Sequence, residues 1–124
     1  MKDLFIIDNY VDEREFRNYI NSLLLNKGYI KVTIDDVRIA DKDKYNDNDI
    51  LAKKGEIYYT IQTFLNTDIN KKQIDETLKD MDKEKVSAGI IITNNYVSEE
   101  VREYANSKLI QVWDRLVLEK DIKQ

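Results

Sequence analysis

Asp49 and Gln62 are the residues whose types and spacing most clearly suggest chemistry. Asp49 opens a predicted short strand over residues 49–53, and Gln62 lies inside a second predicted strand over residues 57–65. A hairpin turn at residues 54–56 would place the two side chains next to each other. A carboxylate oxygen beside an amide oxygen is the start of a site for Mg²⁺, which takes oxygen ligands and keeps several waters. Asp49 as a turn residue and Gln62 as a structural amide are the simpler interpretations of the same positions.

The composition narrows the chemistry that this pair could perform. The chain has no cysteine and no histidine. Disulfides, thiol nucleophiles, imidazole bases and zinc sites built on those ligands are therefore excluded. Carboxylates, lysines, tyrosines and hydroxyl groups remain as the side chains available for catalysis.

Two lysine pairs, Lys53-Lys54 and Lys71-Lys72, are the candidates for contacting phosphate groups of DNA. The formal net charge of -4 argues against tight non-specific DNA binding, because neutralising phosphates supplies most of that affinity. The simpler interpretation is that both pairs are solvated lysines, one at a turn and one at the start of a helix. The aromatic residues Tyr58, Tyr59 and Trp113 are interpreted as packing residues.

The periodicity of apolar residues predicts the elements that position these side chains. Helical spacing covers residues 12–27, 70–81, 98–107 and a last helix that starts after Asp114. Strand patterns cover residues 29–39 with a bend at 35–36, then 49–53, 57–65, 87–93 and 109–113. The predicted N-caps are Asp12, Asn70 with Gln73 in a capping box, Ser98 and Asp114.

The order of these elements is helix, three strands, helix, strand, helix, strand, helix. Local antiparallel pairing is expected first, and helix-linked parallel strands follow. The sequence therefore predicts a single α/β domain over residues 1–124, with a mixed sheet of about five strands and helices on both faces. No stretch has the length of a membrane span or the pattern of a signal peptide, so a cytoplasmic protein without membrane contact is expected.

The segment around Asp49 and Gln62 resembles the Mrr-like branch of the PD-(D/E)XK nucleases, in which a strand beginning with Asp is followed by one ending in Gln-x-Lys. Residues 25–29, 88–98, 103–105 and 110–114 extend the similarity, which covers about residues 12–122. The resemblance implies a restriction-endonuclease-like three-layer fold. It also implies a Mg²⁺-dependent DNA endonuclease, with Asp49 and Gln62 as catalytic and metal-binding residues.

Two positions depart from the family pattern. Phe64 stands where the resemblance places the lysine, and Arg17 follows Phe16 where a Glu is often found. The lysine would activate the attacking water and stabilise charge near the phosphate, so its loss predicts a degenerate catalytic site with weak or absent Mg²⁺ binding. The leading hypothesis is a DNA-associated pseudo-nuclease that works as a homodimer or with a protein partner.

Two alternatives stay open. One of the four lysines named above could have taken over the role of the missing lysine, which would make the chain an active Mg²⁺-dependent endonuclease. The chain could instead be a non-enzymatic protein-interaction or inhibitory module that does not contact DNA.

Overall fold

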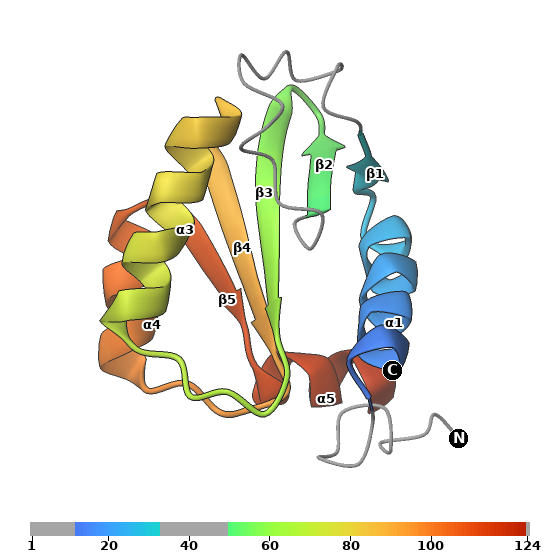
Figure 1. Cartoon of the computed structure of the whole chain (residues 1–124). Coiled ribbons are helices and arrows are strands. Elements are labelled where there is room, and N and C mark those ends of the chain that lie inside the picture. The colour runs from blue at the N-terminus through green and yellow to red at the C-terminus, as the bar shows by residue number, and fades with distance from the viewer. Residues whose placement is uncertain (1–11, 33–49, 124) are drawn as a thin grey trace.

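The computed structural model describes residues 12–32 and 50–123. In these ranges the elements are the helices α1 (Glu13–Asn26), α3 (Lys71–Glu84), α4 (Glu99–Ser107) and α5 (Arg115–Lys123), and the strands β1 (Ile30–Lys31), β2 (Ile50–Lys54), β3 (Ile57–Phe64), β4 (Ala88–Thr93) and β5 (Ile110–Trp113) (Figure 1). Their order along the chain confirms the predicted order.

The five strands form one mixed sheet in the order β1-β2-β3-β4-β5. β1, β2 and β3 pair antiparallel, whereas β3, β4 and β5 pair parallel. The switch occurs at β3 because a tight turn at Gly55-Glu56 joins it to β2, and a whole helix, α3, joins it to β4. The predicted mixed α/β sheet is confirmed.

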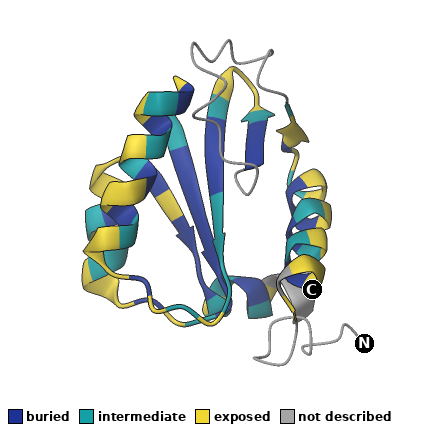
Figure 2. Cartoon of the chain, viewed as in Figure 1, coloured by how far each residue is buried: buried dark blue, intermediate teal, exposed yellow. Residues whose placement is uncertain are grey.

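Each face of the sheet is covered by its own pair of helices (Figures 1 and 2). Alternate residues of the strands, such as Ile61 and Ile90, join a core cluster with Phe16 of α1 and Leu118 of α5. The residues between them join a second cluster against α3 and α4. Burying one such side chain completely contributes about 1.5–3 kcal/mol, so the layered burial fixes which face each strand residue occupies.

The helix starts follow the predicted caps. The Asp12 carboxylate accepts a hydrogen bond of 2.8 Å from the Glu15 backbone N–H. At α3 the Asn70 side chain and the Gln73 side chain form a reciprocal capping box. Ser98 caps α4, and the Asp114 carboxylate accepts hydrogen bonds from the first turn of α5. All four predicted N-caps are confirmed.

Two elements differ from the sequence-based boundaries. α3 continues three residues beyond the predicted end and stops at Lys85, whose backbone is left-handed with φ of 58°. The strand predicted over residues 29–39 is described only as β1, because residues 33–49 lie outside the described part of the chain. The predicted bend at residues 35–36 lies outside it too. None of the described helices is long and apolar enough to cross a membrane.

Candidate functional site

Gln62 lies near the carboxyl end of β3, the central strand of the sheet. It is half-buried, and β4 places Ile91 beside it in the parallel register. Its amide nitrogen Nε2 donates a hydrogen bond of 3.1 Å to the Thr60 Oγ1. Thr60 is fully buried on the same face. Gln62 and Thr60 therefore offer neutral oxygen atoms at this position but no negative charge.

Phe64 lies two residues further on the same face of β3. It is half-buried and packs against the core cluster under α3 and α4, as its same-face neighbour Tyr58 also does. In the register with β4 it pairs with Thr93, which is fully buried. An ammonium group at this position would lose hydration against apolar neighbours, whereas a phenyl ring gains burial there.

Asp49 lies outside the described residues. The described ladder between β2 and β3 ends at the pair Ile50 and Ile61, both buried on the α1 face. The prediction that Asp49 meets Gln62 stays a prediction. In α1, Phe16 is fully buried and Arg17 follows it, so no carboxylate stands at the position where the resemblance places a Glu.

The described residues do not form a metal site by themselves. Among residues 12–32 and 50–123, no three Asp, Glu, His or Cys side chains gather where they could hold an ion. Gln62 and Thr60 offer neutral oxygens, and Mg²⁺ sites in proteins are built on at least one carboxylate. The predicted role of Gln62 as a ligand therefore depends on Asp49.

Comparison with known protein families bears on this geometry. A family model, Mrr_cat, described as restriction endonuclease, matches residues 9–120. The chain belongs to the Mrr-type restriction endonuclease family. No match was found among curated proteins or among solved structures. The family membership confirms the resemblance and the restriction-endonuclease-like fold, a mixed five-stranded sheet between helices.

The lysines predicted to contact DNA fall into two separate groups in this Mrr-type domain. Lys53 and Lys54 lie at the β2–β3 turn, where their ammonium groups stand 5.5 Å from the Tyr58 ring and 4.9 Å from the Tyr29 ring. Lys71 and Lys72 open α3 beyond the other end of β3 (Figure 1). The eight residues of β3 separate the groups by about 25 Å, so the four lysines do not form one patch.

Lys71 and Lys72 also differ from each other. The Lys71 ammonium forms an exposed ion pair of 3.5 Å with Glu100 and lies 5.2 Å from the Tyr104 ring. Lys72 is exposed, and its backbone N–H donates to the Asn70 cap. The exposed ion pair contributes at most about 1 kcal/mol, so a phosphate group could displace Glu100 at little cost.

A polar network that the sequence analysis did not predict joins the loops at the carboxyl ends of the parallel strands. Asn94, buried after β4, accepts a hydrogen bond of 2.7 Å from the Asn66 N–H and donates one of 2.8 Å to the Asn66 side chain. Asn95 donates to the Thr67 carbonyl at 2.8 Å. The consecutive asparagines after a buried strand were the only sequence signal for this connection.

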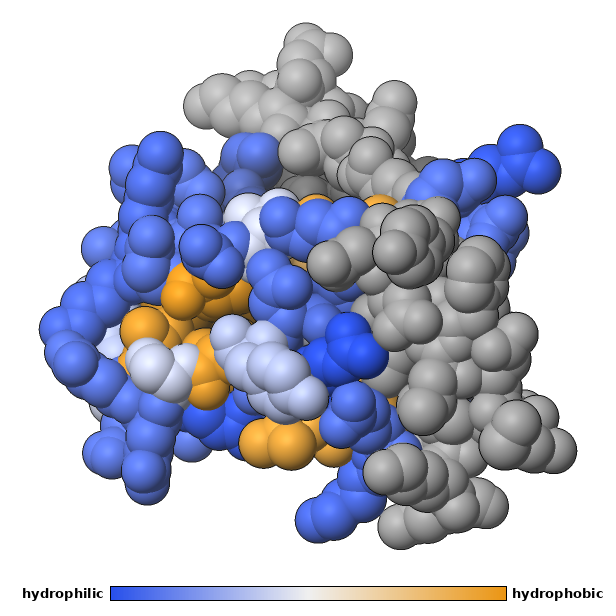
Figure 3. All heavy atoms as spheres, turned by 90° about the horizontal axis from the view of Figure 1, so that it is seen from below, coloured by the Kyte–Doolittle hydropathy of each residue, from blue (hydrophilic) through white to orange (hydrophobic). Residues whose placement is uncertain are grey.

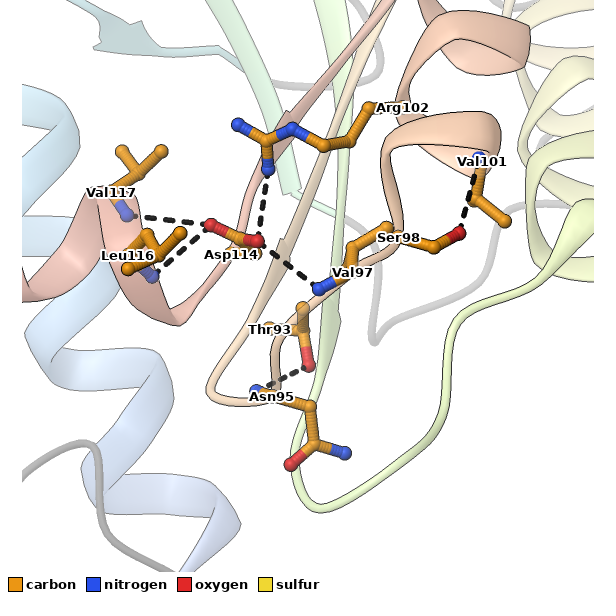
Figure 4. A network of polar contacts seen from close by, with 9 residues as sticks. All are labelled: Thr93, Asn95, Val97, Ser98, Val101, Arg102, Asp114, Leu116 and Val117. Atoms are coloured by element: carbon orange, nitrogen blue, oxygen red, sulfur yellow. Dashed lines mark hydrogen bonds and ion pairs between the residues drawn. The ribbon is translucent and has the colours of Figure 1, made fainter.

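Asp114 forms the second part of this network (Figure 4). Its carboxylate is 1% exposed and accepts hydrogen bonds from the Val97 N–H at 3.1 Å and from two N–H groups of α5. The Arg102 guanidinium of α4 lies 2.9 Å from it as an ion pair. Because these partners occupy both oxygens, Asp114 ties α4, β5 and α5 together, and a ligand role would break that connection.

The surface at the same end of the sheet carries exposed apolar groups. Figure 3 shows apolar residues within a largely hydrophilic face. Two large exposed side chains lie at this end, Tyr96 after β4 and Leu116 in the first turn of α5, at 60% and 59% exposure. The Arg115 guanidinium stands 6.0 Å from the Tyr96 ring.

Proposed function

We propose that this domain associates with DNA and does not hydrolyse it, because its nuclease site is degenerate at Phe64. The observation that carries the proposal is the position of the Phe64 ring, on the face of Gln62 and packed into the cluster under α3 and α4. The family pattern places an ammonium group at that position. Losing one preorganised charge of this kind typically lowers catalytic rates by two to three orders of magnitude, roughly 3–4 kcal/mol.

The proposed remnant of the metal site consists of Asp49 and Gln62. If the antiparallel register continued by one residue beyond Ile50 and Ile61, Asp49 would pair with Gln62. Residues paired in this way share a sheet face, so the carboxylate would stand next to the amide. One charged and one neutral oxygen ligand give weak Mg²⁺ affinity, since the ion stays largely hydrated.

Lys53 and Lys54 are poorly placed to replace the missing lysine. β2 places Lys54 opposite Ile57, four residues from the pair of Ile50 and Ile61, or about 13 Å along the strand. Lys71 is held only by an exposed ion pair with Glu100, so Lys71 and Lys72 stay the candidates for the active-endonuclease alternative. The positions of Lys53 and Lys54 support the degenerate site over an endonuclease that uses either of them.

DNA association is proposed to use the lysines at the two ends of β3 as separate phosphate contacts, in a domain of the restriction endonuclease family. With a net charge of -4 the binding should be weak and should fall steeply with salt. A homodimer stays part of the proposal, and Tyr96 and Leu116, at 60% and 59% exposure, are candidates for its contact surface.

Two assays on the purified protein test this proposal. Duplex DNA should show a mobility shift that weakens with salt and again when Lys53, Lys54, Lys71 and Lys72 are changed to Glu. Supercoiled plasmid with Mg²⁺ or Mn²⁺ should remain uncut. Metal-dependent nicking that disappears in Asp49→Ala would show that the site is active, and an unchanged mobility of DNA would support the protein-interaction alternative.

A further inference from the structure

Lysines gather at the end of the sheet opposite to Gln62 and Phe64. Three turns lie at this end, between β2 and β3, between α3 and β4, and between α4 and β5 (Figure 1). One or two lysines stand at the start of each turn, and together these four amino-end lysines are Lys53, Lys54, Lys85 and Lys108. Glu56 and Asp82 are the exposed carboxylates in these turns and the adjoining end of α3, so the ammonium groups outnumber them.

The direction of the helices explains part of this charge. α3 and α4 both end at the amino ends of the strands, where the negative pole of a helix favours a cation by about 0.3–1 kcal/mol. Lys85 and Lys108 are the C-cap residues of these two helices. Lys53 and Lys54 lie at the end of a strand, so no helix dipole accounts for them. At the other end of the sheet the dipoles favour acids, and the first turn of α4 holds two glutamates.

Ion pairs do not neutralise the amino-end lysines. In the described part of the chain, none of the four ammonium groups forms an ion pair with a carboxylate. The cations near the carboxyl ends differ, because Lys71 pairs with Glu100 at 3.5 Å and Arg115 pairs with Glu119 at 3.0 Å. Apart from Lys72, a phosphate group at that end has to displace a carboxylate. At the amino ends it meets positive charge that no carboxylate offsets.

Three of the amino-end lysines stand over aromatic rings. The distances from Nζ to the ring centre are 5.5 Å for Lys53 and Tyr58, 4.9 Å for Lys54 and Tyr29, and 5.6 Å for Lys108 and Tyr104. A ring face attracts an ammonium group but leaves its positive charge in place. A lysine held in this way loses less side-chain freedom when it binds an anion, which favours binding.

The surface between these lysines is uncharged. A hollow of about 390 Å³ opens at the amino ends of β3, β4 and β5, and none of the described residues that line it is charged. Ile57 and Leu109, at 44% and 68% exposure, belong to this lining. Strands in a sheet lie about 4.8 Å apart, so the lysines from β2 to β5 extend over about 14 Å, the length of about four base pairs of DNA.

We propose that the amino-end lysines form the phosphate-binding surface for duplex DNA, and that Lys71 and Lys72 contribute little to it. The inference rests on the proposed DNA association, adds Lys85 and Lys108 to it, and divides its lysines unequally. Membership of the restriction endonuclease family favours DNA over an acidic protein as the source of negative charge. DNA bound at this surface lies at the opposite end of β3 from Gln62, so binding does not depend on an intact nuclease site.

Two matched double variants test this assignment through the salt dependence of DNA binding. Fluorescence anisotropy of a labelled duplex measures the affinity of the full chain between about 50 and 200 mM salt, and each lost phosphate contact lowers the slope of log K against log salt by about 0.9 in magnitude. Lys85→Gln with Lys108→Gln should therefore lower it by about 1.8, and Lys71→Gln with Lys72→Gln by less than about 0.5. Lys85→Arg with Lys108→Arg keeps the charges and should keep the slope. Both lysines are exposed, so circular dichroism should show unchanged folding.

The other outcomes separate this inference from the proposed DNA association. An equal or larger loss of slope in the variant of Lys71 and Lys72 would overturn the inference and leave the association standing. An unchanged slope in both Gln variants would do the same. Absence of DNA binding by the natural chain would overturn both. Poly-glutamate, with fewer charges per unit length than duplex DNA, should compete more weakly, and equal competition would overturn the choice of DNA in favour of an acidic protein segment.

Discussion

The two ends of the parallel strands are built in opposite ways. At the carboxyl ends, buried Asn94 and Asp114 connect every loop through short hydrogen bonds and an ion pair. At the amino ends, a hollow is bordered by the exposed and strained Leu109. The first arrangement satisfies its buried polar groups, whereas the second leaves a large apolar side chain exposed on a left-handed backbone. Both ends contain a left-handed residue, but Asn66 at the carboxyl ends is hydrogen-bonded to Asn94, whereas Leu109 at the amino ends is 68% exposed.

Removing Asp114 should cause the largest change in the free energy of unfolding. Asp114→Ala leaves Arg102 without its buried partner and removes the cap of α5, which should lower the free energy of unfolding by about 3–4 kcal/mol. Urea denaturation followed by circular dichroism measures the loss. Asp114→Asn keeps a capping oxygen and should lose less. A change below about 1 kcal/mol in Asp114→Ala would contradict a stabilising role for the network.

Removing Asn94 should have the next largest effect. Asn94→Ala leaves the Asn66 backbone N–H without the acceptor at 2.7 Å. The free energy of unfolding should fall by about 2 kcal/mol, the cost of an unsatisfied polar group and a lost pair of hydrogen bonds. The same urea experiment measures it, and Asn106→Ala at the open end serves as the matched control, with a change near zero.

Leu109→Gly should have the opposite sign. Glycine adopts the left-handed backbone without strain, and the leucine side chain is mostly exposed. Stability should rise by about 0.5–1 kcal/mol after the entropy cost of glycine is subtracted. Thermal unfolding measures the shift. A lower Tm would mean that the Leu109 side chain stabilises the fold, and the contrast between the two ends would weaken.

The smallest expected effect is the change in alkaline stability when the hydroxyl group of the buried Tyr29 is removed. Burial raises the pKa of the Tyr29 hydroxyl above 10.0, and a hydrogen bond with Gln111 partly opposes this shift. The folded state thus keeps its proton where the unfolded chain loses it, so stability falls as pH rises above about 10. Tyr29→Phe should flatten this alkaline loss in denaturation curves measured between pH 8 and about 11. An unchanged slope would show that another tyrosine causes it.

The fold was largely predictable because its signals are local. Apolar periodicity located the helices and strands, and single polar residues such as Asp12, Ser98 and Asp114 marked the helix starts. The end of α3 was placed too early because Lys85 gives no sequence signal for a left-handed backbone. The parity of Gln62 and Phe64 on one face of β3 was also predicted and is confirmed by their shared register and packing.

The site was less predictable because it depends on distances between separate elements. The lysine pairs look equivalent in the sequence, yet β3 holds them at opposite ends of the sheet. The ion pair of Arg102 with Asp114 joins α4 to the end of β5, and no spacing rule indicates it. The same holds for the hollow, whose lining comes from three strands and one helix end.

The central claim is that Phe64 makes the nuclease site degenerate. It is tested most directly by comparing plasmid nicking by the natural chain and by Phe64→Lys, both with Mn²⁺. The account predicts that the natural chain gives no nicking above the level of Asp49→Ala, and that any gain of nicking belongs to Phe64→Lys and requires Asp49 and Gln62. Nicking by the natural chain at the rate of Phe64→Lys, lost in Asp49→Ala, would contradict it.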